Sequence, residues 1–217
     1  MNNSQIKELC TLFTNYPQLQ NCQNDIMNAF DIIKHCCLKK GLIMTCGNGG
    51  SASDAGHIVG ELMKGFKLKR PLTAEQKKML TDYFPEEGSY LASHMQQAIP
   101  AIALTDQTSL STAFSNDIAA DMVFAQQVFG YGKPGDVLIG LSTLGNSKNV
   151  VNACKVAKAF EMKTIAMTGE AGGELNHICD ITIRVPANET YRIQEYHLPI
   201  YHCICAMLED FFFCDRL

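Results

Sequence analysis

The stretch "LIMTCGNGGSASDAGHIVGELMKGF", residues 42–66, joins a short apolar run to a glycine-rich loop and a helical pattern. An apolar run of this length is typical of a buried strand in a parallel sheet. Glycine, asparagine and serine after such a strand let the backbone approach an anion at a helix N-terminus. The stretch therefore predicts a strand, a phosphate-binding turn and a helix, in that order.

Four further apolar runs repeat this pattern along the chain. They are IPAIALT (99–105), DVLIGLST (136–143), KTIAMTG (163–169) and DITIRVP (180–186). Helical patterns separate them, and strands that alternate with helices favour a parallel sheet covered on both faces. We therefore expect an α/β fold, a three-layer sandwich with a five-stranded parallel sheet, whose ligands bind at the carboxyl ends of the strands.

The 217 residues are the size of one domain, and we interpret 1–217 as a single domain. Apolar residues three and four apart predict an N-terminal helical region at 1–40. Residues 73–98 fit neither strand nor core and predict a helical insertion, for which a lid that hinges at Gly88 and a surface or oligomer-contact helix pair are both open.

Residues 191–213 predict one long helix with a bend at Pro199, because proline removes a helical hydrogen bond.

Composition excludes several classes of protein. Hydrophobic residues make up 47% of the chain, but no run approaches the roughly 20 residues of a membrane span. A net charge of -4 argues against a nucleic-acid surface. The start MNNSQIKELC lacks the marks of a secretory signal, so we expect a cytoplasmic protein in which most of the ten cysteines are reduced, buried thiols.

A second hydroxyl-rich loop lies in LSTLGNSKNV, residues 141–150, again between a strand and a helix. Two such loops at one edge of a sheet predict a site for an anionic sugar. The side chains expected to hold the phosphate are Ser51, Ser142, Thr143 and Ser147. An ordinary glycine-rich turn remains the alternative for the first loop, because its glycines match neither the dinucleotide motif nor the P-loop.

His57 and Glu61 follow the first loop with the i, i+4 spacing of one helix face. An imidazole and a carboxylate in this arrangement can meet at one cation. The alternative is a solvated helix edge.

With these motifs the chain resembles the sugar isomerase (SIS) family, and within it the phosphoheptose isomerases. The resemblance covers nearly the whole chain except residues 73–98. It is carried by CGNGGSASDAGHIVGEL (46–62), PAIALTDQTSLSTAFSND (100–117), LSTLGNSKNV and RIQEYHLPIYH (192–202). It implies the SIS fold and an aldose–ketose isomerase that converts sedoheptulose 7-phosphate to D-glycero-D-manno-heptose 7-phosphate.

The resemblance also implies a divalent metal, expected to be one zinc ion per subunit, with the ligands His57, Glu61, Gln194 and His202. Glu61 is expected to take the proton that gives an enediol, and His202 to act as the complementary acid. Eight residues of helix rise about 12 Å, so Gln194 and His202 meet at one ion only if the Pro199 region bends or if different subunits supply them. A core histidine is the alternative for His202, and for His197 a core role is favoured.

The two polar loops and the resemblance together give the residues expected to bind substrate, with Asn116 and Asp117 included because they match family positions that touch substrate hydroxyls. The full set is Asn48, Gly49, Gly50, Ser51, Glu61, Asn116, Asp117, Ser142, Thr143, Leu144, Ser147 and Gln194. For Asn116 and Asp117 the alternative is a helix cap or turn. Leu144 departs from the family pattern, in which a serine often occupies that position, so one hydroxyl is lost.

Two other interpretations stay open. One is a non-catalytic SIS protein that senses a phosphosugar or assembles with a replication-initiation partner, and the other is an isomerase of a different phosphosugar. The presence of all four metal-ligand residues favours an enzyme. The family resemblance further implies a homotetramer.

Overall fold

The computed structural model describes residues 3–214, so the outermost residues of the expected helical region 1–40 and of the expected domain 1–217 lie outside it. Its centre is a sheet of five parallel strands in the order β2-β1-β3-β4-β5. The strands are β1 (Ile43–Cys46), β2 (Ala101–Ala103), β3 (Val137–Leu141), β4 (Lys163–Thr168) and β5 (Ile181–Arg184). The five predicted strands and their parallel arrangement are confirmed.

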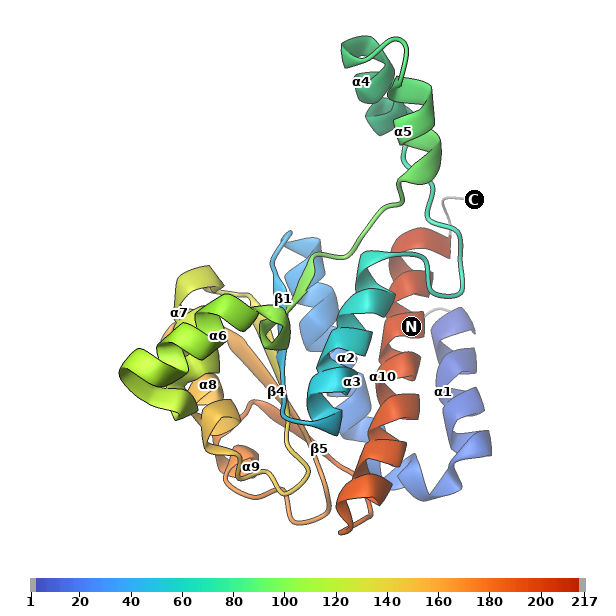
Figure 1. The fold of residues 1–217 in the computed structure, drawn as a ribbon. Helices are drawn as coiled ribbons and strands as arrows, with labels where there is room; N and C mark the ends of the chain where they lie inside the picture. Colours follow the sequence, from blue (N-terminus) through green and yellow to red (C-terminus); the bar gives the residue numbers. More distant parts are fainter. Residues whose placement is uncertain (1–2, 215–217) are drawn as a thin grey trace.

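Helices flank this sheet and complete the chain (Figure 1). The α-helices are α1 (Asn3–Asn15), α2 (Gln23–Leu38), α3 (Gly50–Met63), α4 (Ala74–Tyr83), α5 (Gly88–His94), α6 (Thr108–Phe114), α7 (Val123–Tyr131), α8 (Lys148–Ala159), α9 (Leu175–Ile178) and α10 (Thr190–Phe213). Three short 3-10 helices and one π-helix complete the set in the described part of the chain. The 3-10 helices are η1 (Pro17–Cys22), η2 (Leu104–Asp106) and η4 (Ala120–Met122), and the π-helix is η3 (Ser115–Ala119).

Alternate strand residues enter two separate cores, as the period of two in a strand requires. Ile139 and Ile165 face a core built with helices α1, α2, α3 and α10. Leu138 and Ala166 face the opposite core, built with α7, α8 and α9. Both faces of the sheet are therefore covered, which confirms the expected three-layer sandwich.

Helix α10 runs unbroken for 24 residues with Pro199 inside it. Its buried residues belong to the core that also contains residues of α1, α2 and α3. Because proline has no N–H, the helical hydrogen bond to the carbonyl of Glu195 is missing at this turn. Packing on three neighbouring helices compensates for that loss.

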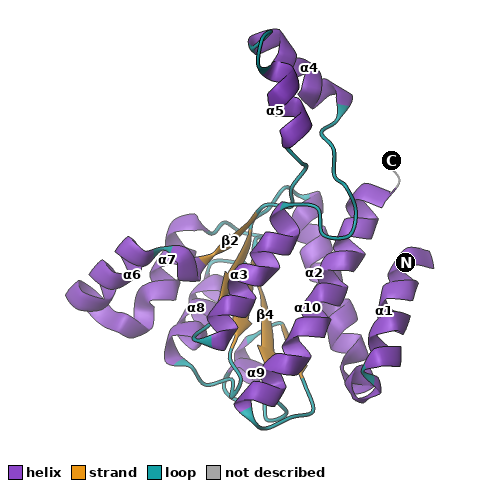
Figure 2. Ribbon diagram, turned by 45° about the vertical axis from the view of Figure 1, so that its right-hand side comes forward, coloured by secondary structure: helices purple, strands orange, loops and turns teal. Residues whose placement is uncertain are grey.

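The insertion forms a helical hairpin, α4 and α5, that extends away from the body of the chain (Figures 1 and 2). Thr73 begins it with a capping box. The Thr73 hydroxyl accepts from the Gln76 N–H, and the side-chain oxygen of Gln76 accepts from the Thr73 N–H. Gly88 lies where any Cβ would collide with the backbone of α4, so this glycine permits close packing of the two helices. The ring of His94 stacks on Tyr90, with ring centroids 4.0 Å apart. The hairpin does not cover the rim of its own chain, contrary to the lid interpretation.

None of the helices within residues 3–214 combines the length and apolarity that a membrane span requires. All ten cysteines are free thiols, as expected.

His197 is a core histidine, in keeping with the interpretation favoured from the sequence. Its side chain is fully buried on α10, Nε2 lies 3.4 Å from the carbonyl oxygen of Thr168, and Nδ1 has no partner among the described residues. Burial lowers the pKa of His197 to about 4, although the Thr168 carbonyl opposes the shift. The unfolded chain therefore binds this proton more readily than the folded chain does.

We predict that the free energy of unfolding is unaffected by His197 above pH 6.5 and falls as the pH drops from 6.5 towards 4. At pH 5 the loss should be roughly 2 kcal/mol, since each pKa unit corresponds to about 1.4 kcal/mol. Urea unfolding of His197→Phe at pH 7 and pH 5 measures this difference. If the free energy of unfolding of His197→Phe falls between pH 7 and pH 5 as much as that of the parent protein, His197 is not the titrating group.

Candidate functional site

The glycine loop between β1 and α3 places polar groups at the carboxyl edge of the sheet. Gly49 adopts a φ of +56°, in the left-handed region that L side chains rarely occupy. Gly50 begins α3, and a Cβ there would lie 2.6 Å from Nε2 of Gln194 and would displace that side-chain amide. Ser51 follows in the first turn of α3 and is 3% exposed. The sequence thus forms a tight turn at a helix N-terminus, the geometry that suits an anion.

The two predicted loops lie side by side. Asn48 and Asn149 exchange two side-chain amide hydrogen bonds, of 2.9 and 2.8 Å, that join the glycine loop to the start of α8. They can meet because β1 and β3 are neighbours in the sheet. The hydroxyl of Ser142 donates to that of Ser147 at 3.0 Å, so these two side chains also converge.

Four further residues predicted for the rim, Thr143, Leu144, Asn116 and Asp117, do not join these side-chain contacts between the two loops. The carbonyl of Thr143 accepts from the N–H of Gly169 at 2.8 Å, which fixes the second loop to the end of β4. Leu144 is 60% exposed, so the lost hydroxyl lies on an open part of the loop. Asn116 donates to Asp117 at 2.9 Å, and both are exposed in the π-helical turn η3 after β2. π-helical turns are rare and recur at functional sites.

Three side chains from two helices meet away from this rim, where α3 packs on α10. Nε2 of His57 lies 3.2 Å from Oε1 of Glu61 and 3.5 Å from Nε2 of His202. His57 and Glu61 share one face of α3, as their spacing predicts, and His202 faces them from α10. Glu61 is 9% exposed, and its Oε2 makes no hydrogen bond within the described chain.

Tyr201 sets the orientation of His57. Its hydroxyl donates to Oδ1 of Asp54 at 3.1 Å and lies 3.0 Å from Nδ1 of His57. Burial and the charge of Asp54 raise the pKa of Tyr201, which keeps the hydroxyl protonated. Since its single proton goes to Asp54, its oxygen accepts from Nδ1–H of His57. The neutral imidazole then carries its lone pair on Nε2, the atom that faces Glu61 and His202.

The resulting cluster is rich in acceptors. A lone pair on Nε2 of His57 faces Oε1 of Glu61, two acceptors that a cation or a proton on Nε2 would reconcile, whereas a neutral His202 can donate its own Nε2–H to His57. Burial and the neighbouring His57 lower the pKa of His202, while Glu61 partly opposes this shift. His202 therefore stays neutral near pH 7, the form that can ligate a metal.

These spacings fit a zinc ion. Tetrahedral zinc with bonds of about 2.0–2.1 Å separates its ligand atoms by roughly 3.3–3.4 Å, close to both distances from His57 Nε2. The ligand cluster is nevertheless not fully assembled, because within residues 3–214 no three His, Cys, Asp or Glu side chains are arranged to hold a metal ion. The pairs His57–Glu61 and His57–His202 are at the spacing of zinc ligands. A bound ion would still have to draw Glu61 and His202 towards each other.

Gln194 lies at the other end of this helix pair. Its carboxamide packs against Gly50, and no described hydrogen bond links it to the three clustered side chains. Gly50 precedes Glu61 by eleven residues of α3, or about 16 Å of helix. The structure thus places Gln194 beside the predicted phosphate loop.

Sequence reasoning missed Asp54 and Tyr201. Asp54, His57 and Glu61 lie at i, i+3 and i+7 of one helix, so their shared face was a readable signal. Tyr201 is 147 residues from Asp54, and no local pattern connects the two.

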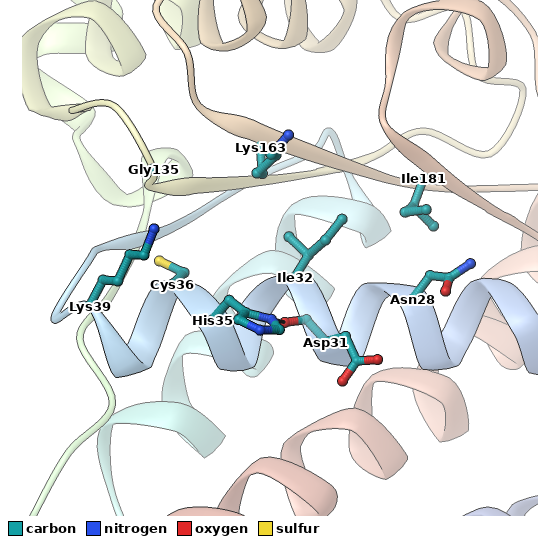
Figure 3. A pocket seen from close by; sticks show the side chains of 9 residues that line it. All are labelled: Asn28, Asp31, Ile32, His35, Cys36, Lys39, Gly135, Lys163 and Ile181. Atoms are coloured by element: carbon teal, nitrogen blue, oxygen red, sulfur yellow. Dashed lines mark hydrogen bonds between the residues drawn. The ribbon is translucent and has the colours of Figure 1, made fainter.

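A cavity of about 420 Å³ lies at the opposite edge of the sheet, between α2 and the first residues of β4 and β5 (Figure 3). Its lining residues are Asn28, Asp31, Ile32, His35, Cys36, Lys39, Gly135, Lys163 and Ile181. None of these residues is among the predicted site residues. Ligands of parallel sheets bind at the carboxyl ends of the strands, so this cavity is not the candidate site.

The SIS domain model matches residues 17–83 and 77–169. Phosphoheptose isomerase of Shewanella baltica (strain OS155 / ATCC BAA-1091) is 38% identical over 187 residues, 85% of this chain and 82% of that protein. Its counterpart in Aliarcobacter butzleri is 42% identical over 168 residues, which cover 77% of this chain and 75% of the relative. The chain belongs to the phosphoheptose isomerase family.

Solved structures agree with this assignment. Phosphoheptose isomerase from Neisseria gonorrhoeae has a TM-score of 0.71 at 32% identity and covers 94% of this chain and 98% of its own. The enzyme from Francisella tularensis has a TM-score of 0.73 at 29% identity over 97% of this chain and all of its own. The protein is therefore an isomerase with the SIS fold, as the sequence motifs predicted.

Removal of the Tyr201 hydroxyl should reduce isomerase turnover about tenfold, in line with the cost of losing a group that orients a metal-ligating histidine. In Tyr201→Phe the ring of His57 loses the acceptor that fixes its tautomer. Steady-state turnover measures the effect.

Tyr196→Phe is the matched control, because that hydroxyl lies on the same helix and, within residues 3–214, accepts from Gln18 Nε2 at 3.3 Å, away from the cluster. Equal turnover in Tyr201→Phe and the parent enzyme would rule out the orienting role.

Proposed function

We propose that this isomerase interconverts sedoheptulose 7-phosphate and D-glycero-D-manno-heptose 7-phosphate with acid–base chemistry centred on Glu61 and His202. The proposal rests on one observation: Nε2 of His57 lies 3.2 Å from Oε1 of Glu61 and 3.5 Å from Nε2 of His202. Family membership supports the substrate, since the relatives are phosphoheptose isomerases.

The reaction moves one proton between adjacent carbons. From the ketose, Glu61 removes a proton from C1 while the C2 oxygen gains one, which gives an enediol. Return of a proton to C2 and loss of one from the C1 oxygen then give the aldose. Glu61 is assigned the carbon proton because it is the carboxylate of the cluster; its Oε2 makes no hydrogen bond among the described residues and lies 3.6 Å from the ammonium of Lys64. His202 suits the oxygen proton because a neutral imidazole can both donate and accept.

A zinc ion is part of the proposal, with His57, Glu61 and His202 as its ligands. Gln194, which the family resemblance implies as a fourth ligand, packs on Gly50 at the far end of α3 and could reach such an ion only after a movement or from another subunit. Bound there, zinc would polarise the sugar oxygens and stabilise negative charge that develops on them. Tyr201 and Asp54 would hold His57 in the ligating tautomer.

The phosphate is assigned to the two loops at the rim. The hydroxyls of Ser51, Ser142 and Ser147, with the N-terminal N–H groups of α3 and α8, supply the donors that an anion requires. Asn48, Gln194 and the loop glycines shape the space between the phosphate and the reacting carbons. Asn116 and Asp117 are proposed to contact sugar hydroxyls.

The proposed working form is a cytoplasmic homotetramer with one zinc ion in each chain. Large apolar side chains stand exposed on the hairpin, among them Tyr83 at 79% and Tyr90 at 65%, and subunit contacts are one means of covering such surfaces.

Glu61→Gln should lower kcat with sedoheptulose 7-phosphate by about a hundredfold or more, the usual scale for loss of a positioned general base. Aldose formation by NMR, with chelated and zinc-reloaded protein side by side, measures both the residue and the metal. Chelation should abolish turnover and zinc should restore it.

Glu195→Gln serves as the control, because Glu195 is an exposed carboxylate on α10 that pairs with Arg192. Near-full turnover in folded Glu61→Gln would reject the assignment of the base. Binding of the sugar phosphate without any turnover in the parent protein would favour the non-catalytic alternative.

A further inference from the structure

A buried ion pair joins the loop after α3 to the last third of α10. Nε of Arg70 lies 2.7 Å from Oε1 of Glu209, and the two residues are 1% and 0% exposed. Charged side chains are almost never buried to this degree unless they are paired. The question is what this pair holds in place.

Glu209 gathers the loop that follows α3. Its Oε1 accepts from the Phe66 N–H at 2.8 Å, and its Oε2 accepts from the N–H groups of Lys67 and Leu68 at 2.7 and 2.9 Å. Burial by itself raises the pKa of Glu209, but these backbone donors and Arg70 lower it below the usual value. The carboxylate is therefore ionised and fully engaged.

Arg70 caps the end of α3 with the rest of its guanidinium. Nη1 donates to the carbonyl of Leu62 at 2.7 Å and Nη2 to that of Glu61 at 3.1 Å. Carbonyls in the last turn of a helix have no intrahelical partner, and a positive charge there is favourable. The planar guanidinium of Arg70 thus links the backbone of Glu61, the proposed base, to the carboxylate of Glu209 on α10.

The same pair reaches His202 by a second route. Phe66, whose N–H is held by Glu209, places its ring 5.3 Å from the ring of His202, between centroids. Glu209 lies seven residues after His202 on α10, about two helical turns. Arg70 thus binds the backbone carbonyl of Glu61, and Glu209 binds the backbone N–H of Phe66, the residue whose ring lies beside His202.

We propose that Arg70 and Glu209 are positioning residues that set the separation of Glu61 and His202 across the helix pair; the kinetic part of this inference rests on the proposed function. A purely structural role is the competing explanation. Apolar side chains of similar volume often replace a buried ion pair without loss of stability. They could not cap two helix carbonyls and bind three consecutive N–H groups.

Arg70→Lys is the decisive variant. Lysine keeps the charge but is a single point donor, so it cannot span Glu209 and both carbonyls in one fork. We expect kcat to fall about tenfold to a hundredfold, the scale of a misplacement near 1 Å, while KM changes less than about threefold because the phosphate loops are untouched. The imidazole NMR signals of His57 and His202 should also shift, and with six histidines in the chain they can be assigned by substitution.

Asp136→Asn is the matched control. Asp136 is 5% exposed before β3, at the opposite edge of the sheet, where it accepts from the N–H groups of Leu42 and Lys133 at 2.8 Å each. Its loss should lower the melting temperature and leave kcat and both imidazole signals unchanged.

Unchanged imidazole signals and kcat in folded Arg70→Lys, with only a lower melting temperature, would overturn the proposal. If Arg70→Lys does not fold, Glu209→Gln tests the route to His202 with the Phe66 ring still present; a shifted His202 signal supports positioning and an unshifted one refutes it. Full activity of Glu61→Gln would reject the proposed function without testing the role of Arg70. The imidazole signals of Arg70→Lys would still decide whether Arg70 positions the side chains of His57 and His202.

Discussion

The packing of α3 on α10 brings two imidazoles and a carboxylate together at hydrogen-bond distances. Nε2 of His57 faces Oε1 of Glu61 at 3.2 Å and Nε2 of His202 at 3.5 Å. Tyr201 and Asp54 hold His57 in the tautomer that carries its lone pair on Nε2. A neutral His202 can donate its Nε2–H to His57, whereas the lone pair of His57 and the carboxylate of Glu61 are reconciled by a divalent cation or by a proton on Nε2, so the chemistry of the site follows from this contact between two helices.

The sheet contributes to the site in a different way. Its topology makes β1 and β3 neighbours, and the loops after them converge through the Asn48–Asn149 amide pair. Helix α3 starts at that rim and carries Glu61 about 16 Å from it. A sugar phosphate with its anionic end on the rim and its reacting carbons near Glu61 would have to lie along α3. Gln194, packed on Gly50, is at the phosphate end of that path.

Sequence alone predicted what depends on local pattern and on topology. Five short apolar runs separated by helical patterns located all five strands. The i, i+4 spacing placed His57 and Glu61 on one helix face. Contacts between residues distant in sequence were beyond its reach: Arg70 and Glu209 are 139 residues apart, and His57 and Tyr201 are 144 apart. The direction of the hairpin was also not predictable, because Gly88 suits a hinge and a close helix contact equally well by residue type.

An anomalous diffraction map of zinc-loaded crystals, collected at the zinc absorption edge, tests the central claim most directly. The account predicts one strong peak per chain, about 2.0–2.2 Å from Nε2 of His57, from the carboxylate of Glu61 and from Nε2 of His202. A catalytically active crystal whose zinc lies elsewhere, with these three side chains turned away from one another, would contradict it.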